Sequence, residues 1–177
     1  TGSLAGRPSG TSLTIRQLIE LMITESDNTA ANLLIDKLGF DYINNTIQTL
    51  GCQDTVLQRK MMDKSTGKEN YTSVQDLILL LQSIYKGTCV SSSADQEMIS
   101  ILKKQKQRNL IPRSLPSGCV IANKAGNLPG IVNDAAIVFT KQGDYILCIL
   151  SKKVDEKQAN EIMPKLSKII YTQHIKQ

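Results

Sequence analysis

The stretch TIRQLIELMITESDNTAANLLIDKLG, residues 14–39, decides how the first part of the chain folds. It consists of two amphipathic segments separated by the polar triplet Ser26-Asp27-Asn28. Apolar residues recur every three or four positions on both sides of the triplet, a spacing that predicts two helices. A Thr-x-x-Gln capping box at Thr14 and Gln17 predicts where the first helix begins, and Gly39 predicts where the second ends.

The rest of the chain changes character after Pro112, from helix signals to strand signals. The further predicted helices cover residues 41–51, capped by Asp41, and residues 73–87, 94–104 and 155–172. The predicted strands cover residues 119–122, 135–139 and 145–150, the last two joined as an antiparallel hairpin. Pro164 is expected to kink or restrict the final helix. The expected fold class is α+β, a single domain with a helical subdomain (12–118) beside an antiparallel sheet covered by helices (119–177).

The composition argues against several classes of function. The 177 residues are 41% hydrophobic and 21% charged, an ordinary balance for a globular domain with a sizeable core. Aromatic residues make up 4%, with no Trp, which argues against stacking of nucleic-acid bases. The net charge of +5 is densest at residues 103–108, which a solvated helix end explains more simply than a nucleic-acid surface. No stretch approaches the roughly 20 apolar residues of a membrane span.

Cysteine and histidine usage argues against a metal site. The four cysteines, Cys52, Cys89, Cys119 and Cys148, form no Cys-x-x-Cys pair, and His174 is the sole histidine. Metal-ligand spacing is therefore missing, and a catalytic triad with a His base is not expected. The cysteine count neither proves nor excludes disulfides. No metal or organic cofactor is implied.

The triplet Ser26-Asp27-Asn28 supports two interpretations. Ser, Asp and Asn are favoured N-cap residues, so the triplet predicts the start of the second helix. The same residues also offer chemistry, because Ser26 carries a hydroxyl that can relay a proton and Asn28 carries an amide that can hold a substrate carbonyl. Both interpretations can hold together, since a capped turn fixes the side chains that it presents.

A second polar string, Lys124-Ala125-Gly126, follows the apolar run 119–122. In a structural interpretation, Lys124 is an exposed strand residue and Gly126 forms a bulge or turn. In a functional one, Lys124 supplies a cation for an anionic substrate and Gly126 lets a substrate backbone approach the strand edge. The backbone N–H of Asn127 would then be placed to stabilise an oxyanion.

In this order, the two strings resemble two of the three motifs of the class A β-lactamase and penicillin-binding-protein superfamily of serine hydrolases. Residues 14–34 look like that family's helix, catalytic loop and following helix. Residues 123–130 and 133–138 look like its active-site strand, turn and next strand. The resemblance covers nearly all of the chain. It implies a helical domain beside an antiparallel α/β domain, with the active site in the cleft between them.

The resemblance also implies a reaction and a role for each residue of the triplet. Ser26 would pass a proton to the leaving nitrogen, Asn28 would bind the substrate amide, and Asp27 would hold the turn. The reaction would be acyl transfer from a β-lactam or a D-alanyl-D-alanine peptide to a serine. Such an enzyme would be exported, to the periplasm or the extracellular space.

For the second string, the resemblance implies that Lys124 assists Ser26 and attracts the substrate carboxylate. Ala125 and Gly126 would line the substrate, and the Asn127 N–H would lie in the oxyanion hole. The family has Lys-Thr-Gly or Lys-Ser-Gly here, and Ala125 removes the hydroxyl that would bind the substrate carboxylate. A lost hydrogen bond to a charged group costs roughly 1.5–3 kcal/mol, so we expect weaker binding.

A second departure concerns deacylation. The string Arg59-Lys60-Met61 aligns with the family's Arg-x-Glu, whose Glu activates the deacylating water, and Met61 cannot act as a base. Asp63 and Glu69 lie nearby in the sequence, but neither can be placed from the sequence. Efficient β-lactam turnover is therefore not expected, and a long-lived acyl-enzyme or peptidase chemistry becomes more plausible.

The third motif, the Ser-x-x-Lys that supplies the nucleophile, should precede Ser26. The sequence has Ser-x-x-Lys at residues 65–68, 83–86 and 100–103, all after Ser26, and chance explains such matches in a chain rich in Ser and Lys. We expect the true segment to precede Thr1 and to carry the first helix and strands of the family's sheet. That N-terminal segment is thus an expected partner of this chain, without which the sheet would keep an uncovered edge.

Three hypotheses follow. The first is a β-lactamase-like serine hydrolase that acts on a β-lactam or a peptidoglycan peptide, with this chain alone inactive for want of its nucleophile. The second is a non-catalytic descendant that keeps the cleft and binds a cell-wall peptide or a protein. The third is an unrelated domain whose motifs are caps and turns.

Overall fold

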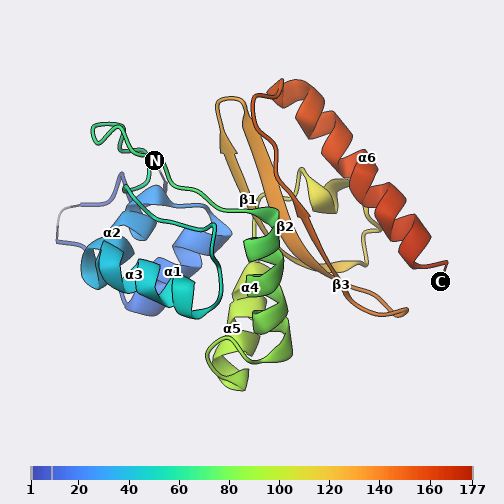
Figure 1. Cartoon of the computed structure of the whole chain (residues 1–177), viewed down its shortest axis with the longest axis horizontal. Helices are drawn as coiled ribbons and strands as arrows, with labels where there is room; N and C mark the ends of the chain where they lie inside the picture. The colour runs from blue at the N-terminus through green and yellow to red at the C-terminus, as the bar shows by residue number, and fades with distance from the viewer. Residues whose placement is uncertain (1, 9, 177) are drawn as a thin grey trace. The chain divides into compact units, whose positions relative to one another are not determined.

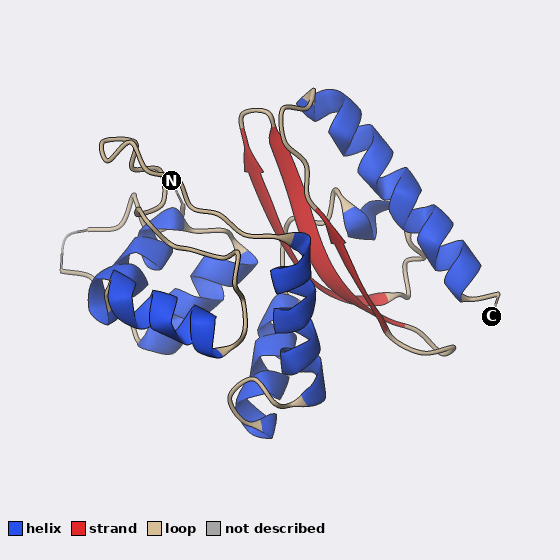
Figure 2. Cartoon of the chain, viewed as in Figure 1, coloured by secondary structure: helices blue, strands red, loops and turns tan. Residues whose placement is uncertain are grey.

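The computed structural model describes residues 2–8 and 10–176, which form two compact units divided after Leu80. The described part of the first unit is built from helices and loops, and the second packs helices around a sheet (Figures 1 and 2). The predicted helical part, residues 12–118, is therefore shared between the units. The helix α4 (Val74–Lys86) begins in the first unit and ends in the second.

The first unit is organised by α1 (Ile15–Thr24), α2 (Asn28–Leu38) and α3 (Phe40–Thr49). The predicted capping box is confirmed, because the Thr14 hydroxyl accepts from the Gln17 N–H while the Gln17 side chain accepts from the Thr14 N–H. Gly39, at φ +79°, ends α2 as predicted and also precedes α3. Asp41 therefore lies in the first turn of α3 and does not cap it, which corrects the predicted boundary. The buried core of these helices comprises Leu4, Leu18, Ala30 and Leu34.

The second unit contains a three-stranded antiparallel sheet in the order β1 (Val120–Leu128), β2 (Ile131–Phe139) and β3 (Tyr145–Ile149). The other elements of this unit are α5 (Ser92–Leu102), the short 3-10 helix η1 (Ile111–Ser114) and α6 (Glu156–His174). The α+β class and the hairpin between the second and third strands are confirmed. The N-cap of α5 is Ser91, so this helix begins and ends about two residues earlier than predicted.

The first two strands are longer than the sequence predicted. The predicted strand 119–122 continues to Leu128, and the predicted strand 135–139 begins at Ile131. The two join through Pro129 and Gly130, with Gly130 at φ +71°, the backbone that a tight turn with glycine in its second central position requires. The strand prediction relied on runs of apolar residues, and the added parts of both strands contain polar residues. These polar side chains can be buried because they hydrogen-bond to each other.

The helix α6 lies along one face of the sheet (Figure 1). Its buried side meets two apolar clusters, one around Ile111, Ile121 and Val138 and one around Leu110, Ala125, Val132 and Met163. Pro164 lies inside α6, where it cannot donate to the carbonyl of Asn160 four residues earlier. The Asn160 carbonyl accepts instead from Arg113 Nη1 at 3.2 Å, and the helix continues to His174.

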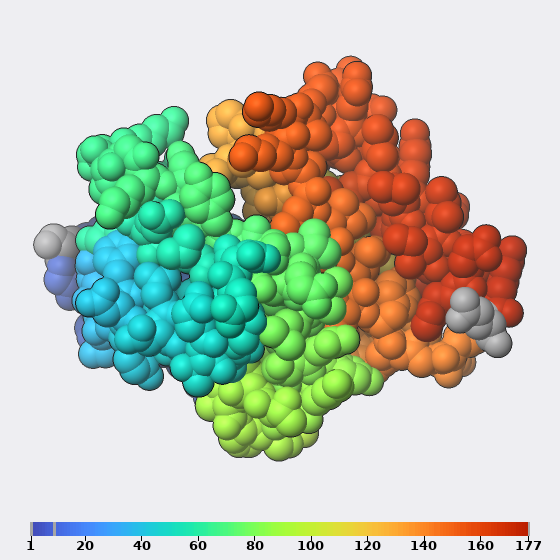
Figure 3. Space-filling view, in the orientation of Figure 1, coloured from blue at the N-terminus to red at the C-terminus, as the bar shows by residue number. Residues whose placement is uncertain are grey.

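Parts of the second unit lack a partner in the described part of the chain. Strands β1 and β3 each pair with β2, and no described strand pairs with the outer edge of either. One flank of α6 exposes Ile162, Leu166, Ile169 and Ile170, which we call the α6 apolar flank. Figure 3 shows α6 at the surface of this unit. Among the described helices, none combines the length and apolarity that crossing a bilayer requires.

Candidate active site

Ser26 stands at the turn between α1 and α2 with an unusual backbone. Its φ is +55°, in the left-handed region that a residue with a Cβ rarely adopts. The following residue, Asp27, donates its N–H back to the Leu21 carbonyl at 3.2 Å, which closes the turn beneath Ser26. A strained backbone held by surrounding bonds is typical of functional sites.

Asp27 is the fully buried residue that holds this turn. Its Oδ1 accepts from the Ala30 N–H at 2.9 Å, which caps α2, and its Oδ2 accepts from the Leu4 N–H at 2.9 Å. Burial raises the pKa of Asp27, but hydrogen bonds from the amides of Leu4, Ala30 and Thr29 outweigh it and lower the pKa overall. The carboxylate therefore stays charged while it joins the N-terminal loop to the start of α2.

Asn28 opens α2, and Asn32 follows one helical turn later on the same face. The Asn32 side chain forms two hydrogen bonds with the backbone of Met61, donating to its carbonyl at 3.1 Å and accepting from its N–H at 2.7 Å. This pair fixes the loop 52–72 beside the helix that carries the triplet. No local pattern indicated this role for Asn32, since its partner lies 29 residues away.

The two carboxylates considered near Met61 are both engaged elsewhere. Glu69 accepts from Arg59 Nη2 at 2.5 Å and from Nε at 3.1 Å. Asp63 accepts from the Ser65 hydroxyl at 2.6 Å and from its N–H at 2.9 Å, and these bonds lower the pKa of Asp63. Each carboxylate is thus tied to its own loop in the first unit.

In the second unit, Lys124, Ala125, Gly126 and Asn127 are consecutive residues of β1. Lys124 is half-buried, and burial lowers the pKa of its ammonium, while the charge of Asp134 acts in the opposite direction. Ala125 is buried in the core with 2% of its surface exposed, whereas Gly126 and Asn127 are exposed. Because side chains alternate along a strand, Lys124 and Ala125 point to opposite faces of the sheet.

Asn123 and Asp134 form a buried polar pair on the face that Ala125 occupies. The Asn123 Nδ2 donates to Asp134 Oδ1 at 3.1 Å, and Asp134 Oδ2 accepts from the Ile111 N–H at 3.1 Å. Burial raises the pKa of Asp134 to about 6, against the hydrogen bonds and the Lys124 charge that lower it. Sequence reasoning missed this pair, although both residues stood within the quoted strand segments.

The three later Ser-x-x-Lys strings lie in ordinary surroundings. Ser65 is exposed and hydrogen-bonded to Asp63, and Ser100 is exposed on α5. The Lys103 ammonium lies 4.2 Å from the centre of the Phe139 ring, a cation–π contact. Ser83 and Lys86 belong to the last turn of α4.

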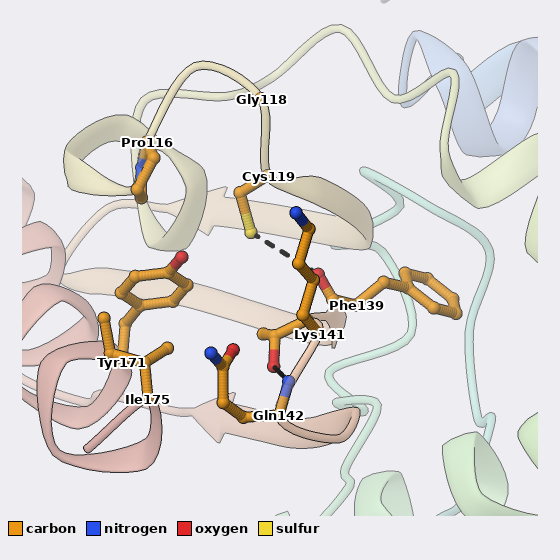
Figure 4. Close-up of a pocket in the computed structure, with 9 residues that line it drawn as sticks. Pro116, Gly118, Cys119, Phe139, Lys141, Gln142, Tyr171 and Ile175 are labelled. Carbon is orange, nitrogen blue, oxygen red and sulfur yellow. Dashed lines mark hydrogen bonds between the residues drawn. The ribbon is translucent and has the colours of Figure 1, made fainter.

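A shallow groove of about 300 Å³ lies at the end of the sheet near the C-terminus of α6 (Figure 4). Its lining includes Pro116, Cys119, Lys141 and Tyr171, and neither predicted motif contributes to it. The Cys119 thiol donates to the Phe139 carbonyl at 3.8 Å, and burial raises the pKa of this thiol. A thiol with a raised pKa is a poor nucleophile, so this groove does not replace the predicted site.

The predicted site residues thus fall into two local groups. Ser26, Asp27 and Asn28 lie together in the first unit, next to the loop that Asn32 holds. Residues 124–127 lie together on β1 of the second unit. That the two groups face one cleft stays a prediction.

Comparisons with known proteins give the family. A profile described as the beta-lactamase enzyme family, Beta-lactamase2, matches residues 1–174. Beta-lactamase BRO-1 of Moraxella catarrhalis is 27% identical over 173 residues, covering 90% of this chain and 55% of that protein. A beta-lactamase of Bacillus licheniformis is 25% identical over 170 residues, with the same two coverages. The chain therefore spans about half the length of the curated relatives it matches.

Solved structures agree with the profile. The crystal structure of a beta-lactamase from Sphaerobacter thermophilus superposes with a TM-score of 0.92 at 30% identity, over 98% of this chain and 68% of that one. The structure of PBP-A superposes with a TM-score of 0.90 at 27% identity, over 99% of this chain and 67% of that one. The fold, the order of the two motifs and the profile match lead to one conclusion: the chain belongs to the beta-lactamase enzyme family.

Proposed function

We propose that this chain is the part of a penicillin-recognising serine hydrolase that binds the substrate and moves the proton. The whole protein would transfer the acyl group of a β-lactam or a D-alanyl-D-alanine peptide to a serine outside these 177 residues. The observation that carries the proposal is the retention of both motifs, Ser26-Asp27-Asn28 and Lys124-Ala125-Gly126, in a chain of this family. A PBP-A variant has been captured as an acyl-enzyme with penicillin G, which shows the proposed chemistry in a related fold.

In the proposed step, the serine oxygen gives up its proton to the lysine of its own Ser-x-x-Lys and attacks the carbonyl carbon. The carbon–nitrogen bond breaks, and the nitrogen takes a proton from the Ser26 hydroxyl, which is reprotonated in turn. The Asn127 N–H would stabilise the oxyanion, and Asn28 would hold the substrate amide. Burial lowers the pKa of Lys124, which makes its ammonium a better proton donor to Ser26 while it still attracts a carboxylate. Asp27 would act through the turn, since its oxygens are occupied by the amides of Leu4 and Ala30.

Deacylation is the step for which the chain lacks an evident base. Met61 cannot activate water, Glu69 is paired with Arg59, and Asp63 is bound to Ser65. The acyl-enzyme should therefore persist, as in a penicillin-binding protein, rather than turn over quickly.

The open edge of β3 and the α6 apolar flank fit the proposal that a further segment carries the nucleophile. A strand that paired with β3 and a helix beside α6 would cover both surfaces of the second unit. We therefore propose that the N-terminal segment predicted from the sequence docks there, and that the complete protein is exported.

A second candidate is a non-catalytic binding protein with the same fold. It is favoured by Met61, because the loss of a deacylation base does not weaken a site that only holds a ligand. The two candidates differ in whether a covalent bond to the substrate forms.

Incubation of the full-length protein with a fluorescent penicillin, followed by a denaturing gel, separates them. Enzyme chemistry predicts covalent labelling that is lost when the serine of an upstream Ser-x-x-Lys is changed. Lys124→Ala should slow labelling about a hundredfold, the usual size of a lost electrostatic contribution to the transition state. The matched control is Lys141→Ala in the β2–β3 turn, which should label at the parent rate.

Absence of labelling by the folded full-length protein would rule out the acyl-transfer proposal. Saturable binding of a D-alanyl-D-alanine peptide without labelling would then support the second candidate. Equal labelling rates for the Lys124 and Lys141 variants would remove Lys124 from the proposed machinery.

A further inference from the structure

The pair Asn123 and Asp134 is a deeply buried polar feature beside the predicted site residues of β1. Asp134 has 1% of its surface exposed and Asn123 none. In the sheet register, Asp134 lies directly opposite Ala125, the residue that follows Lys124. A buried carboxylate beside a strand that should present a cation calls for an explanation, because burying a charge is costly unless it is paired.

The contacts of the pair connect β1 to the segment before it. Asp134 accepts from the Asn123 side chain on β1 and from the Ile111 N–H on η1. Asn123 Nδ2 also donates to the Gln107 carbonyl at 3.3 Å, and the Ser167 hydroxyl of α6 donates to the Ile111 carbonyl at 2.9 Å. The carboxylate thus lies at a junction where β1, β2, η1 and α6 are held to one another.

The pair is also incompletely satisfied. The Asn123 Oδ1 is buried and has no hydrogen-bond partner among the described residues. A buried unpaired acceptor costs about 1–3 kcal/mol, which makes the junction sensitive to small changes in its hydrogen bonding. The side chain is therefore oriented by its Nδ2, which donates to Asp134 and Gln107.

The Asp134 carboxylate at this junction acts electrostatically on Lys124. Burial lowers the pKa of Lys124, and the Asp134 carboxylate opposes this effect. Burial raises the pKa of Cys148 on β3 to about 11, and the Asp134 carboxylate adds to it. The α6 residues buried against this face, Met163, Pro164 and Ser167, carry no ionisable group, and the η1 guanidinium of Arg113 is bonded to the Asn160 carbonyl.

We propose that Asp134 is a positioning residue for Lys124: through its hydrogen bonds with Asn123 and Ile111, it fixes the section of β1 that presents the ammonium. The part that concerns catalysis rests on the proposed function. The part that concerns the position of Lys124 does not.

The proposal fixes the direction of a pH effect. When the pH falls through about 6, Asp134 takes up a proton. The hydrogen bonds from Asn123 and Ile111 then lose their charge assistance, so β1 is held less firmly at Lys124. Acylation should therefore weaken on the acidic side of about pH 6.

The first test uses Asp134→Asn in the full-length protein, with NMR titration of isotope-labelled lysine and no substrate present. The pKa of Lys124 should fall in this variant, because the charge that opposes the effect of burial is removed. Acylation by a fluorescent penicillin at pH 7 should slow about tenfold, because β1 is held less firmly at Lys124. The inflection near pH 6 in the acylation profile should also disappear. The matched control is Asp95→Asn, which alters another buried aspartate of this unit, bound to the amides of Cys89 and Val90. The control should keep the parent Lys124 pKa and the inflection.

A folded Asp134→Asn protein with the parent Lys124 pKa and the parent acidic inflection overturns the proposal. If that variant fails to fold, Asn123→Ala tests the same link with the carboxylate in place, and it should shift the acylation rate in the same direction. An unchanged rate in a folded Asn123→Ala protein also counts against the proposal. If the parent shows no labelling, the Lys124 titration alone decides, so failure of the proposed function is distinguishable from failure of this inference.

Discussion

Asp27 and Asp134 are both buried aspartates beside predicted site residues, and they differ in how they are satisfied. Asp27 receives backbone amides on both oxygens, and its pKa falls below the ordinary 3.8. Asp134 accepts from the Ile111 amide and the Asn123 side chain, and the Ala135 amide also lowers its pKa, yet burial outweighs these bonds and raises the pKa to about 6. The charge of a buried carboxylate therefore depends on the balance between the cost of desolvation and the hydrogen bonds that it accepts.

The comparison implies different tasks. Asp27 is a structural anion that caps α2 and holds the N-terminal loop, so its charge stabilises the first unit. Burial disfavours the ionised form of Asp134, so this residue fits a task in the site better than a task in stability. Three experiments test this difference.

The largest effect is expected from Asp27→Ala. It removes the cap of α2 and leaves the Leu4 and Ala30 amides without their acceptor, which should lower the free energy of unfolding by about 3–4 kcal/mol. Urea unfolding at pH 7 measures it, with Asp41→Ala in the first turn of α3 as the control. A loss below 1 kcal/mol would show that Asp27 does not hold the turn.

The second effect is a change in how the free energy of unfolding depends on pH in Asp134→Asn. Because the pKa of Asp134 is raised from 3.8 to about 6, the folded state binds the proton more tightly than the unfolded state between these values. The parent protein should lose about 3 kcal/mol of stability relative to the variant as the pH rises from 4 to 7. Unfolding curves at several pH values measure the difference, and parallel curves for the two proteins would contradict the prediction. Asp27 has the opposite sign, since its contribution is lost when the pH falls below about 4.

A smaller effect tests the loop that Asp27 holds. A Cβ at Gly2 would lie 2.2 Å from Asp27 Cγ, and Gly2 has φ +132°. Gly2→Ala should therefore push the loop off the carboxylate and cost about 2 kcal/mol, less than loss of Asp27 itself. Gly6→Ala is the control, because no heavy atom lies within 4 Å of the Cβ it adds. Equal melting temperatures for the two variants would show that the contact between the loop and Asp27 adds nothing to stability.

The sequence predicted those features whose signals are local. The capping box at Thr14 and the glycine end at Gly39 each depend on a few neighbouring residues, and both are confirmed. The full length of β1 was missed because its polar second half gains stability from pairing with β2, a contact that no local pattern reveals.

The same reason explains what was missed in the site. The bonds between Asn32 and Met61 and between Asn123 and Asp134 join residues that are 29 and 11 positions apart. The pKa of Asp134 is raised because several elements bury this residue, and their arrangement cannot be predicted from the composition. The roles of Ser26, Asn28, Lys124 and Asn127 stay predictions until the labelling experiments are done.

The backbone of Ser26 has a consequence for anyone who evolves this protein in the laboratory. A left-handed conformation costs a residue with a Cβ about 1 kcal/mol more than it costs glycine. A screen that rewards thermostability alone would therefore favour replacing the hydroxyl-bearing residue with glycine. That replacement would raise the melting temperature but remove the hydroxyl proposed to carry the proton. Only a selection that also measures the reaction would keep the serine.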